Sequence, residues 1–190
     1  MDTTPPSTPP TPGDPNSMGP PPVAVIVSQY NGEVTGRLLA GAKAEYLRRG
    51  GSEWSLGVFE VPGAFELTTM AGVLTRLKGW HAVICLGCLI KGETKHDEYI
   101  ASAVTNTLAG LTARTGIAIG YGLITANTPE QALARAGGDK GNKGTDAMAA
   151  ALETMKAMAV VRQGAEARNA GAQSRVGGPS PDKTRPGGGV

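Results

Sequence analysis

Four short apolar runs, each followed by a stretch with helical periodicity, constrain the fold of this chain more than any other feature. The first run, residues 23–28, is continuous and β-branched, which is typical of a strand covered on both faces. Further strands are expected at residues 54–61, 82–86 and 117–125. Because strands that alternate with helices pair in parallel through right-handed crossovers, the sequence predicts an α/β protein: a three-layer α/β/α fold around a central four-stranded parallel sheet.

Local signals place helices between and after these strands. Asn31 is expected to cap the first helix, and Thr94, with Asp97 three residues later, is expected to cap the third in a variant of the capping box. Thr128 followed by Pro129 is a near-ideal helix start. The expected helices cover residues 34–49, 62–77, 96–112, 128–136 and 143–161.

Both ends of the chain differ in composition from the middle. Residues 1–22 carry most of the 14 prolines and almost no large apolar side chains, which indicates a disordered or polyproline-like arm. Residues 163–190 are rich in Gly, Ala, Ser and Arg and indicate a disordered, Gly-rich tail. The predicted folded domain therefore covers residues 23–162, which is long enough for a sizeable core.

Charge and hydropathy argue against several classes of partner. The net charge is +2, and the basic residues do not gather with aromatic residues into a stripe, so no nucleic-acid partner is expected for the core. No apolar stretch reaches membrane-spanning length, and the N-terminal arm lacks the features of a secretory signal. The sequence therefore predicts a cytoplasmic protein without a membrane partner.

Cys85 and Cys88 have the C-x-x-C spacing of redox pairs and of half a zinc site. In an extended strand, however, residues three apart point to opposite faces, and no second C-x-x-C or histidine cluster completes a metal site. We therefore expect two reduced cysteines that pack in the interior, and no metal.

The turn after the third strand, residues 87–99, is the strongest candidate for a functional site. Free backbone N–H groups at a helix start attract phosphate, and His96 is expected in the first helical turn. An imidazole beside an anion site suits general acid–base chemistry on a phosphorylated small molecule. By itself, a capped helix start with a nearby histidine is equally consistent with a purely structural role.

Polar or aromatic side chains also follow the other strands. Tyr30 and Asn31 follow the first, Phe65 and Glu66 follow the second, and residues 121–127 surround the end of the fourth. Ligands of such sheets bind beyond the carboxyl ends of the strands, and the four loops are expected to converge on that one edge of the sheet. Aromatic rings there would offer a stacking surface to a flat heteroaromatic substrate, although isolated rings near strand ends are often core residues.

Several motifs between residues 23 and 158 occur in the order found in the 6,7-dimethyl-8-ribityllumazine synthase family, which the chain resembles. The motifs are Val61-Pro62-Gly63-Ala64-Phe65-Glu66, Gly92-Glu93-Thr94-Lys95-His96 with Tyr99, Tyr121-Gly122-Leu123-Ile124-Thr125, Glu130-Gln131-Ala132, Arg135-Ala136-Gly137 and Gly141-Asn142-Lys143-Gly144. The resemblance implies a flavodoxin-like fold in a homo-oligomer. That oligomer is a pentamer with active sites between neighbouring subunits, and some members assemble pentamers into a sixty-subunit shell.

The resemblance also implies an activity. Members of the family are transferases of riboflavin biosynthesis that condense 5-amino-6-ribitylaminouracil with 3,4-dihydroxy-2-butanone 4-phosphate, with loss of phosphate and water. They need no metal and no organic cofactor. Holding two reactive partners side by side is itself a large part of such catalysis.

Carried over to this chain, the resemblance makes His96 the proton-transfer residue and Arg135 the ligand of the butanone phosphate. The backbone N–H groups of Glu93 and Thr94 complete the phosphate cradle. Tyr121 comes from the neighbouring subunit. The residues implied to contact the pyrimidine, the ribityl chain or the rest of the substrate are Tyr30, Asn31, Ala64, Phe65, Glu66, Leu89, Ile90 and Lys143.

Some positions depart from the family pattern. Gln29 and Lys91 stand where arginine is common, Glu93 stands where a small residue is usual, and Asp97 stands where an aromatic residue often follows the histidine. Glu93 and Asp97 add negative charge near a site for an anion. Two alternatives therefore stay open, a flavin- or lumazine-binding module without turnover and a shell-forming scaffold, the second suggested by the unusual ends. Prolines in the N-terminal arm also put shell assembly in doubt, because family members usually add a strand there.

Overall fold

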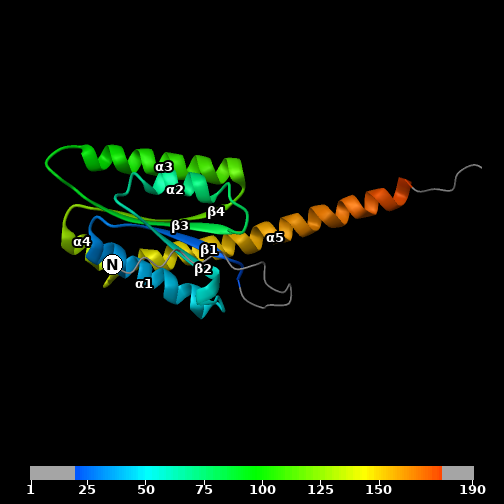
Figure 1. Ribbon diagram of the computed structural model, residues 1–190, viewed down its shortest axis with the longest axis horizontal. Coiled ribbons are helices and arrows are strands. Elements are labelled where there is room, and N and C mark those ends of the chain that lie inside the picture. Colours follow the sequence, from blue (N-terminus) through cyan, green and yellow to red (C-terminus); the bar gives the residue numbers. More distant parts are fainter. Residues whose placement is uncertain (1–19, 177–190) are drawn as a thin grey trace, which may run out of the picture. The chain divides into compact units, whose positions relative to one another are not determined.

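A four-stranded parallel sheet lies at the centre of the molecule, as the sequence predicts (Figure 1). The computed structural model describes residues 20–176. The strand order is β2-β1-β3-β4, the order of flavodoxin-like sheets. The strands are β1 (Val23–Ser28), β2 (Leu56–Val61), β3 (Ala82–Ile90) and β4 (Ala118–Ala126).

Helices cover both faces of this sheet, which confirms the predicted three layers. α2 and α3 lie on one face, and α1, α4 and the first part of α5 lie on the other (Figure 1). The helices are α1 (Gly32–Arg48), α2 (Leu67–Leu74), α3 (His96–Thr115), α4 (Pro129–Ala134) and α5 (Lys143–Val176). A 3-10 turn, Glu53–Ser55, precedes β2, and a small hairpin of β5 (Ala136–Gly138) and β6 (Gly141–Asn142) joins α4 to α5.

The core is built on the two central strands. All six residues of β1 and the first seven of β3 are buried, because each strand has neighbours on both sides and helices above and below. α5 lies close to α1, since a Cβ atom on Gly144 would collide with the carbonyl oxygen of Leu38. The side chain of Asn142 ties the same helices together by donating to the Arg37 carbonyl and accepting from the Gly144 N–H.

Several predicted boundaries are wrong for local reasons. The second strand begins at Leu56 rather than at residue 54, because Ser52 and Ser55 bond to each other around the 3-10 turn. The third strand continues to Ile90, four residues further than expected. The second helix begins at Leu67 rather than at Pro62, because the loop before it bonds to the end of β1.

The three predicted helix caps have different outcomes. Thr128 caps α4 as predicted, accepting a hydrogen bond of 3.3 Å from the Gln131 N–H. The Thr94 cap is wrong: α3 begins one residue later, with Lys95 at the N-cap, and no described side chain caps that end. Asn31 does occupy the N-cap position of α1, but its side chain does not cap the helix.

The predicted boundary of the C-terminal tail does not coincide with the end of a helix. Residues 163–176 continue α5 where disorder was expected, because Ala, Gln, Glu and Arg are good helix formers and the first proline comes later. Within the described residues, residues 156–176 form a unit separate from residues 20–155. The rest of the predicted tail, residues 177–190, and residues 1–19 of the predicted arm lie outside the described residues.

The last residues of the proline arm are held against the domain. The carbonyl oxygen of Pro22 accepts from the His81 N–H, and the hydroxyl of Tyr46 donates to the carbonyls of Pro20 and Pro21. Over residues 20–176, no helix is long and apolar enough to cross a membrane.

Cys85 and Cys88 are both buried in β3, which confirms their packing role. Neither forms a disulfide in the described part of the chain. Burial raises the pKa of the Cys85 thiol to about 12 and that of Cys88 to about 11, so both are poor nucleophiles.

Candidate active site

A largely apolar cleft of about 1020 Å³ opens at the carboxyl ends of β1, β2 and β3. Its walls come from the β1–α1 turn, the β2–α2 loop, the end of β3 and the first two turns of α3. Most of the predicted site residues meet there, so the expected convergence of these three loops is confirmed. The predicted residues that line it are Tyr30, Asn31, Ala64, Phe65, Glu66, Leu89, Ile90, Thr94 and His96.

Three aromatic rings stand at the mouth of the cleft. Tyr30 is 71% exposed, Phe65 is 53% exposed and Tyr99 is 70% exposed. Exposing large rings to water is unfavourable unless another surface covers them. The rings therefore offer stacking surfaces for a flat ligand, as the sequence predicted for Tyr30 and Phe65.

Asn31 shapes the cleft through its backbone and its amide. Its φ of 57° is left-handed, and it is the one described residue other than glycine with a positive φ. This conformation turns its side chain toward β3, where Nδ2 donates to the Cys88 carbonyl at 2.9 Å. The bond fixes the turn that presents Tyr30.

Glu66 holds the opposite loop in place. Its Oε2 accepts a hydrogen bond of 2.9 Å from the Gly63 N–H, closing the turn between β2 and α2. Gly63 suits that turn because a Cβ atom there would lie 3.0 Å from the same oxygen and 3.1 Å from the ring of Tyr30. Glu66 therefore has a structural role beside any contact with a ligand.

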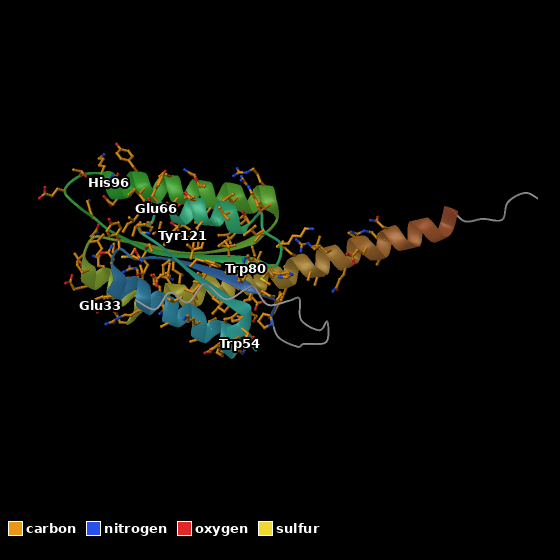
Figure 2. The ribbon with its side chains drawn as sticks, in the orientation of Figure 1. Glu33, Trp54, Glu66, Trp80, His96 and Tyr121 are labelled. Carbon is orange, nitrogen blue, oxygen red and sulfur yellow. The ribbon has the colours of Figure 1, made fainter. Side chains whose placement is uncertain are left out.

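His96 is the first residue of α3 and lies exposed on the wall of the cleft. Figure 2 shows it on the same side of the sheet as Glu66, at the opposite end of the sheet from Trp54 and Trp80. Free N–H groups at this helix end make the surroundings attractive to an anion. An exposed imidazole beside stacking rings can exchange protons with a bound ligand.

Arg135 does not lie in this cleft. It lines a second, polar pocket of about 560 Å³ on the other side of the start of α3, between that helix and the end of β4. Its Nη1 donates to the Gln131 carbonyl at 3.0 Å, which orients the guanidinium. Within one chain, the predicted phosphate ligand and His96 therefore occupy neighbouring pockets rather than a common one.

The remaining predicted residues also lie outside the cleft. Tyr121 is 43% exposed, and its hydroxyl bonds to the Thr105 hydroxyl at 2.8 Å, between β4 and α3. The Lys143 ammonium pairs with Asp146 at 2.7 Å. Glu93 is exposed in the loop before α3.

Sequence reasoning quoted Tyr99 in its motif but assigned no site role to it or to the rest of the helix wall. Tyr99, Ile100 and Ala103 line the cleft three, four and seven residues after His96. Such residues share one helix face, so this spacing was the signal available in the sequence. Asp97 was treated as a source of repulsion, but it lines both pockets.

The sequence model of 6,7-dimethyl-8-ribityllumazine synthase matches residues 21–159, which include both pockets. The chain belongs to this family. Curated relatives named 6,7-dimethyl-8-ribityllumazine synthase include one from Chloroherpeton thalassium, 42% identical over 68% of this chain and 84% of the relative. Another, from Campylobacter fetus, is 38% identical over 70% of this chain and 85% of the relative.

A third relative with the same name, from Nitratiruptor, is 40% identical over 69% of this chain and 85% of its own length. All three matches cover 84–85% of the relative. The resemblance inferred from the motifs is thereby confirmed.

Proposed function

We propose that this chain is a transferase of riboflavin biosynthesis that condenses 5-amino-6-ribitylaminouracil with 3,4-dihydroxy-2-butanone 4-phosphate. The observation that supports this most directly is the position of His96, in a cleft with exposed rings, in a chain that belongs to the lumazine synthase family. A flat pyrimidine fits between rings, and its attack on a ketone requires proton transfers.

In this proposal the cleft binds the pyrimidine substrate. Tyr30 and Phe65 stack on the ring, and backbone groups of Leu89 and Ile90, at the end of β3, bond to its edge. Ala64 and Glu66 border the ribityl chain. Glu66 has a second carboxylate oxygen besides the one that bonds to Gly63, and this oxygen accepts from ribityl hydroxyls.

In this proposal His96 is the general acid–base that accepts and donates protons during the reaction. It assists imine formation between the amine and the ketone, and it assists the later elimination of phosphate. An imidazole suits both steps because it gives and takes a proton near neutral pH. Backbone N–H groups of Glu93 and Thr94, at the start of α3, support the phosphate.

The position of Arg135 supports an active site shared by neighbouring subunits. In one chain the guanidinium lines the pocket on the far side of Asp97 from His96. We propose that Arg135, Tyr121 and Lys143 of one subunit complete the cleft of the next in a homopentamer. A larger shell and a cytoplasmic location stay predictions.

Turnover can be tested directly by following lumazine absorbance with the two substrates. Substituting His96→Ala is expected to lower kcat by about 10²- to 10⁴-fold, which is the usual contribution of a general acid–base. His81→Ala is the matched control, because His81 is the other histidine and precedes β3 at the opposite edge. An intact protein that binds the pyrimidine without turnover would support the binding-module alternative instead.

The shared site predicts complementation. At butanone-phosphate concentrations well below the raised KM of the arginine variant, oligomers of His96→Ala alone or Arg135→Ala alone are expected to have little activity. After unfolding and refolding as a mixture, roughly a quarter of the sites would combine an intact histidine with an intact arginine if the site crosses the interface of a cyclic oligomer. No recovery in mixed oligomers would place both residues in one subunit.

A further inference from the structure

A hydrogen bond between two hydroxyl groups joins β4 to α3. The hydroxyl of Tyr121, on β4, lies 2.8 Å from Oγ1 of Thr105, on α3 (Figure 2). Both residues are exposed, so burial in the interior does not hold either side chain in place. In the described part of the chain, this is the one hydrogen bond that the Tyr121 side chain makes.

The direction of this bond follows from a second one. Oγ1 of Thr105 also lies 2.7 Å from the carbonyl oxygen of Ala101, which can only accept a hydrogen bond. Because a hydroxyl has one hydrogen, Thr105 donates its own to Ala101 and accepts the hydrogen of Tyr121. The Tyr121 side chain is thus fixed at both ends, by β4 at its backbone and by α3 at its hydroxyl, and the bond selects one position of the ring.

Thr105 lies on the side of α3 that faces away from the cleft. It follows Glu98 by seven residues and Ala101 by four, so the three share one helix face, and both of the others line the polar pocket with Arg135. With about 3.6 residues per turn, this face is opposite the one that carries His96 and the rest of the helix wall of the cleft.

Tyr121 belongs to the same outer surface. It precedes Thr125 by four residues on β4, so both side chains point to one face of the sheet, and Thr125 also lines the pocket with Arg135. β4 is an edge strand of the sheet, with β3 as its one neighbour. The bond to Thr105 therefore keeps the Tyr121 ring away from the cleft of its own chain, on the surface that also presents Arg135.

We propose that Thr105 is a positioning residue, whose hydroxyl holds the Tyr121 ring where it covers the pyrimidine bound in the cleft of the next subunit. This inference rests on the proposed function, in which Tyr121 and Arg135 of one subunit complete the neighbouring cleft. Without the bond, the exposed ring is free to take other rotamers. With it, the ring is already ordered before the ligand arrives, and less free energy is lost on binding.

The test is equilibrium binding of 5-amino-6-ribitylaminouracil to the full-length protein, followed by calorimetry, with its KM and kcat in turnover. Thr105→Val keeps the β-branched shape and removes the acceptor. It is expected to raise the dissociation constant and the KM by about 2- to 10-fold, the usual contribution of one hydrogen bond. The kcat is expected to change little, because a loss of uniform binding raises KM alone. Thr105→Ser keeps the hydroxyl and is expected to bind like the parent protein.

Tyr121→Phe shows whether Thr105 acts through the tyrosine. It keeps the ring and removes the donor, so by itself it is expected to weaken binding about as much as Thr105→Val does. Because the two substitutions break the same bond, Thr105→Val is expected to cause no further loss in the Tyr121→Phe background. An effect of Thr105 elsewhere in α3 would instead add to that of Tyr121→Phe.

The matched control is Thr112→Val. Thr112 lies on the same helix and also donates to a carbonyl four residues earlier, that of Leu108 at 3.1 Å, but no tyrosine of the described residues bonds to it. This variant is expected to leave pyrimidine binding unchanged. Thermal unfolding and oligomer size of every variant separate a loss of affinity from a defect in folding or assembly.

Four results would overturn the inference. Unchanged pyrimidine binding in Thr105→Val would show that the bond does not matter to the site. An equal loss in Thr112→Val would assign the effect to α3 as a whole. Additive losses in the double variant would mean that Thr105 does not act through Tyr121. A smaller oligomer of Thr105→Val that accounts for its lost affinity would make the bond a contact for assembly.

Failure of the proposed function gives a different pattern. If the intact protein neither binds the pyrimidine nor forms lumazine, the synthase assignment fails, and the inference fails with it. If the intact protein binds and turns over but Thr105→Val behaves like it, only the role of Thr105 fails.

Discussion

The two edges of the parallel sheet use their polar and aromatic side chains in different ways. At the amino edge, Tyr46 is buried at the end of α1, and its hydroxyl bonds to the Ser55 hydroxyl at 2.7 Å. Trp80 packs edge-on against Phe59, with ring centroids 5.8 Å apart. At the carboxyl edge, the rings of Tyr30 and Phe65 stand exposed around an open cleft.

A charge cluster reinforces the amino edge. Glu45 is buried at the end of α1 and accepts hydrogen bonds from Arg48 and Arg49, and Arg49 also pairs with Glu153 of α5. These bonds, that from Arg48 first, lower the pKa of the Glu45 carboxyl from 4.5 to about 2. The comparison shows that one edge satisfies its groups internally, which stabilises the fold, while the other leaves them available to ligands.

The largest expected effect is on stability at the amino edge. Replacing Tyr46 by Ala removes a fully buried ring and leaves a cavity, so it is expected to lower the free energy of unfolding by about 3–5 kcal/mol. Urea titration at fixed protein concentration measures this. Tyr46→Phe keeps the ring and should lose about 1 kcal/mol with the hydroxyl. A fall in kcat per folded site in either Tyr46 variant would contradict the conclusion that the amino edge serves stability and the carboxyl edge serves ligand binding.

A substitution of Arg135, at the carboxyl edge, is expected to change substrate binding rather than stability. Arg135→Ala is expected to raise the KM for the butanone phosphate by about 10- to 100-fold, since hydrogen bonds to charged groups contribute about 1.5–3 kcal/mol. Unfolding should change little, because the one bond of the guanidinium among the described residues is to the carbonyl of Gln131, four residues earlier in α4. Arg114→Ala, at the other end of α3, is the control. An unchanged KM would remove Arg135 from the phosphate site.

Glu45 gives the amino edge a pH dependence. Because the folded-state pKa is lower than the unfolded value, its contribution is complete above about pH 4.5 and is lost as the pH falls toward 2. Glu45→Gln is expected to cost about 2 kcal/mol at pH 6, less than the full shift since solvent screens the exposed Arg48. The difference between the variant and the parent protein should shrink at low pH. A difference that stays constant would mean that packing, not charge, holds this edge.

The smallest effect compares one exposed ring from each edge. Phe65→Ala is expected to weaken pyrimidine binding by about tenfold, since a stacked aromatic pair contributes about 0.5–1.5 kcal/mol beyond the area it buries. Trp54, 86% exposed at the amino edge, is the control, and Trp54→Ala should leave binding unchanged. Equal losses in both variants, measured by equilibrium titration, would contradict a binding role specific to the carboxyl edge.

Local sequence signals predicted those helix ends that depend only on neighbouring residues. Thr128 and Pro129 begin α4 as expected, because capping depends on neighbours within three residues. The Thr94 signal failed although its spacing was similar, since α3 begins one residue later and Asp97 turns to the pockets instead of the helix end. The end of α5 was missed because composition was taken as disorder over residues that form helices well.

The candidate site was predictable where it follows from sheet topology. Carboxyl ends of parallel strands meet at one edge, so Tyr30, Phe65 and His96 were expected together and line one cleft. Sheet topology predicts the edge at which a side chain lies, but it does not predict which pocket at that edge the side chain lines. Arg135 follows β4 at that same edge, yet it lines a separate pocket beyond the start of α3.

The sequence by itself determined the alternation of strands and helices, the parallel sheet and the family, because these depend on periodicity, turn chemistry and motif order along the chain. Only the tertiary structure decided that His96 and Arg135 occupy different pockets of one chain, that Asp97 borders both, and that Asn31 bonds to β3. The physical reason is that these relations are distances through space between residues far apart in sequence. They depend on how the helices pack on the sheet, and this packing cannot be inferred from any short stretch of sequence.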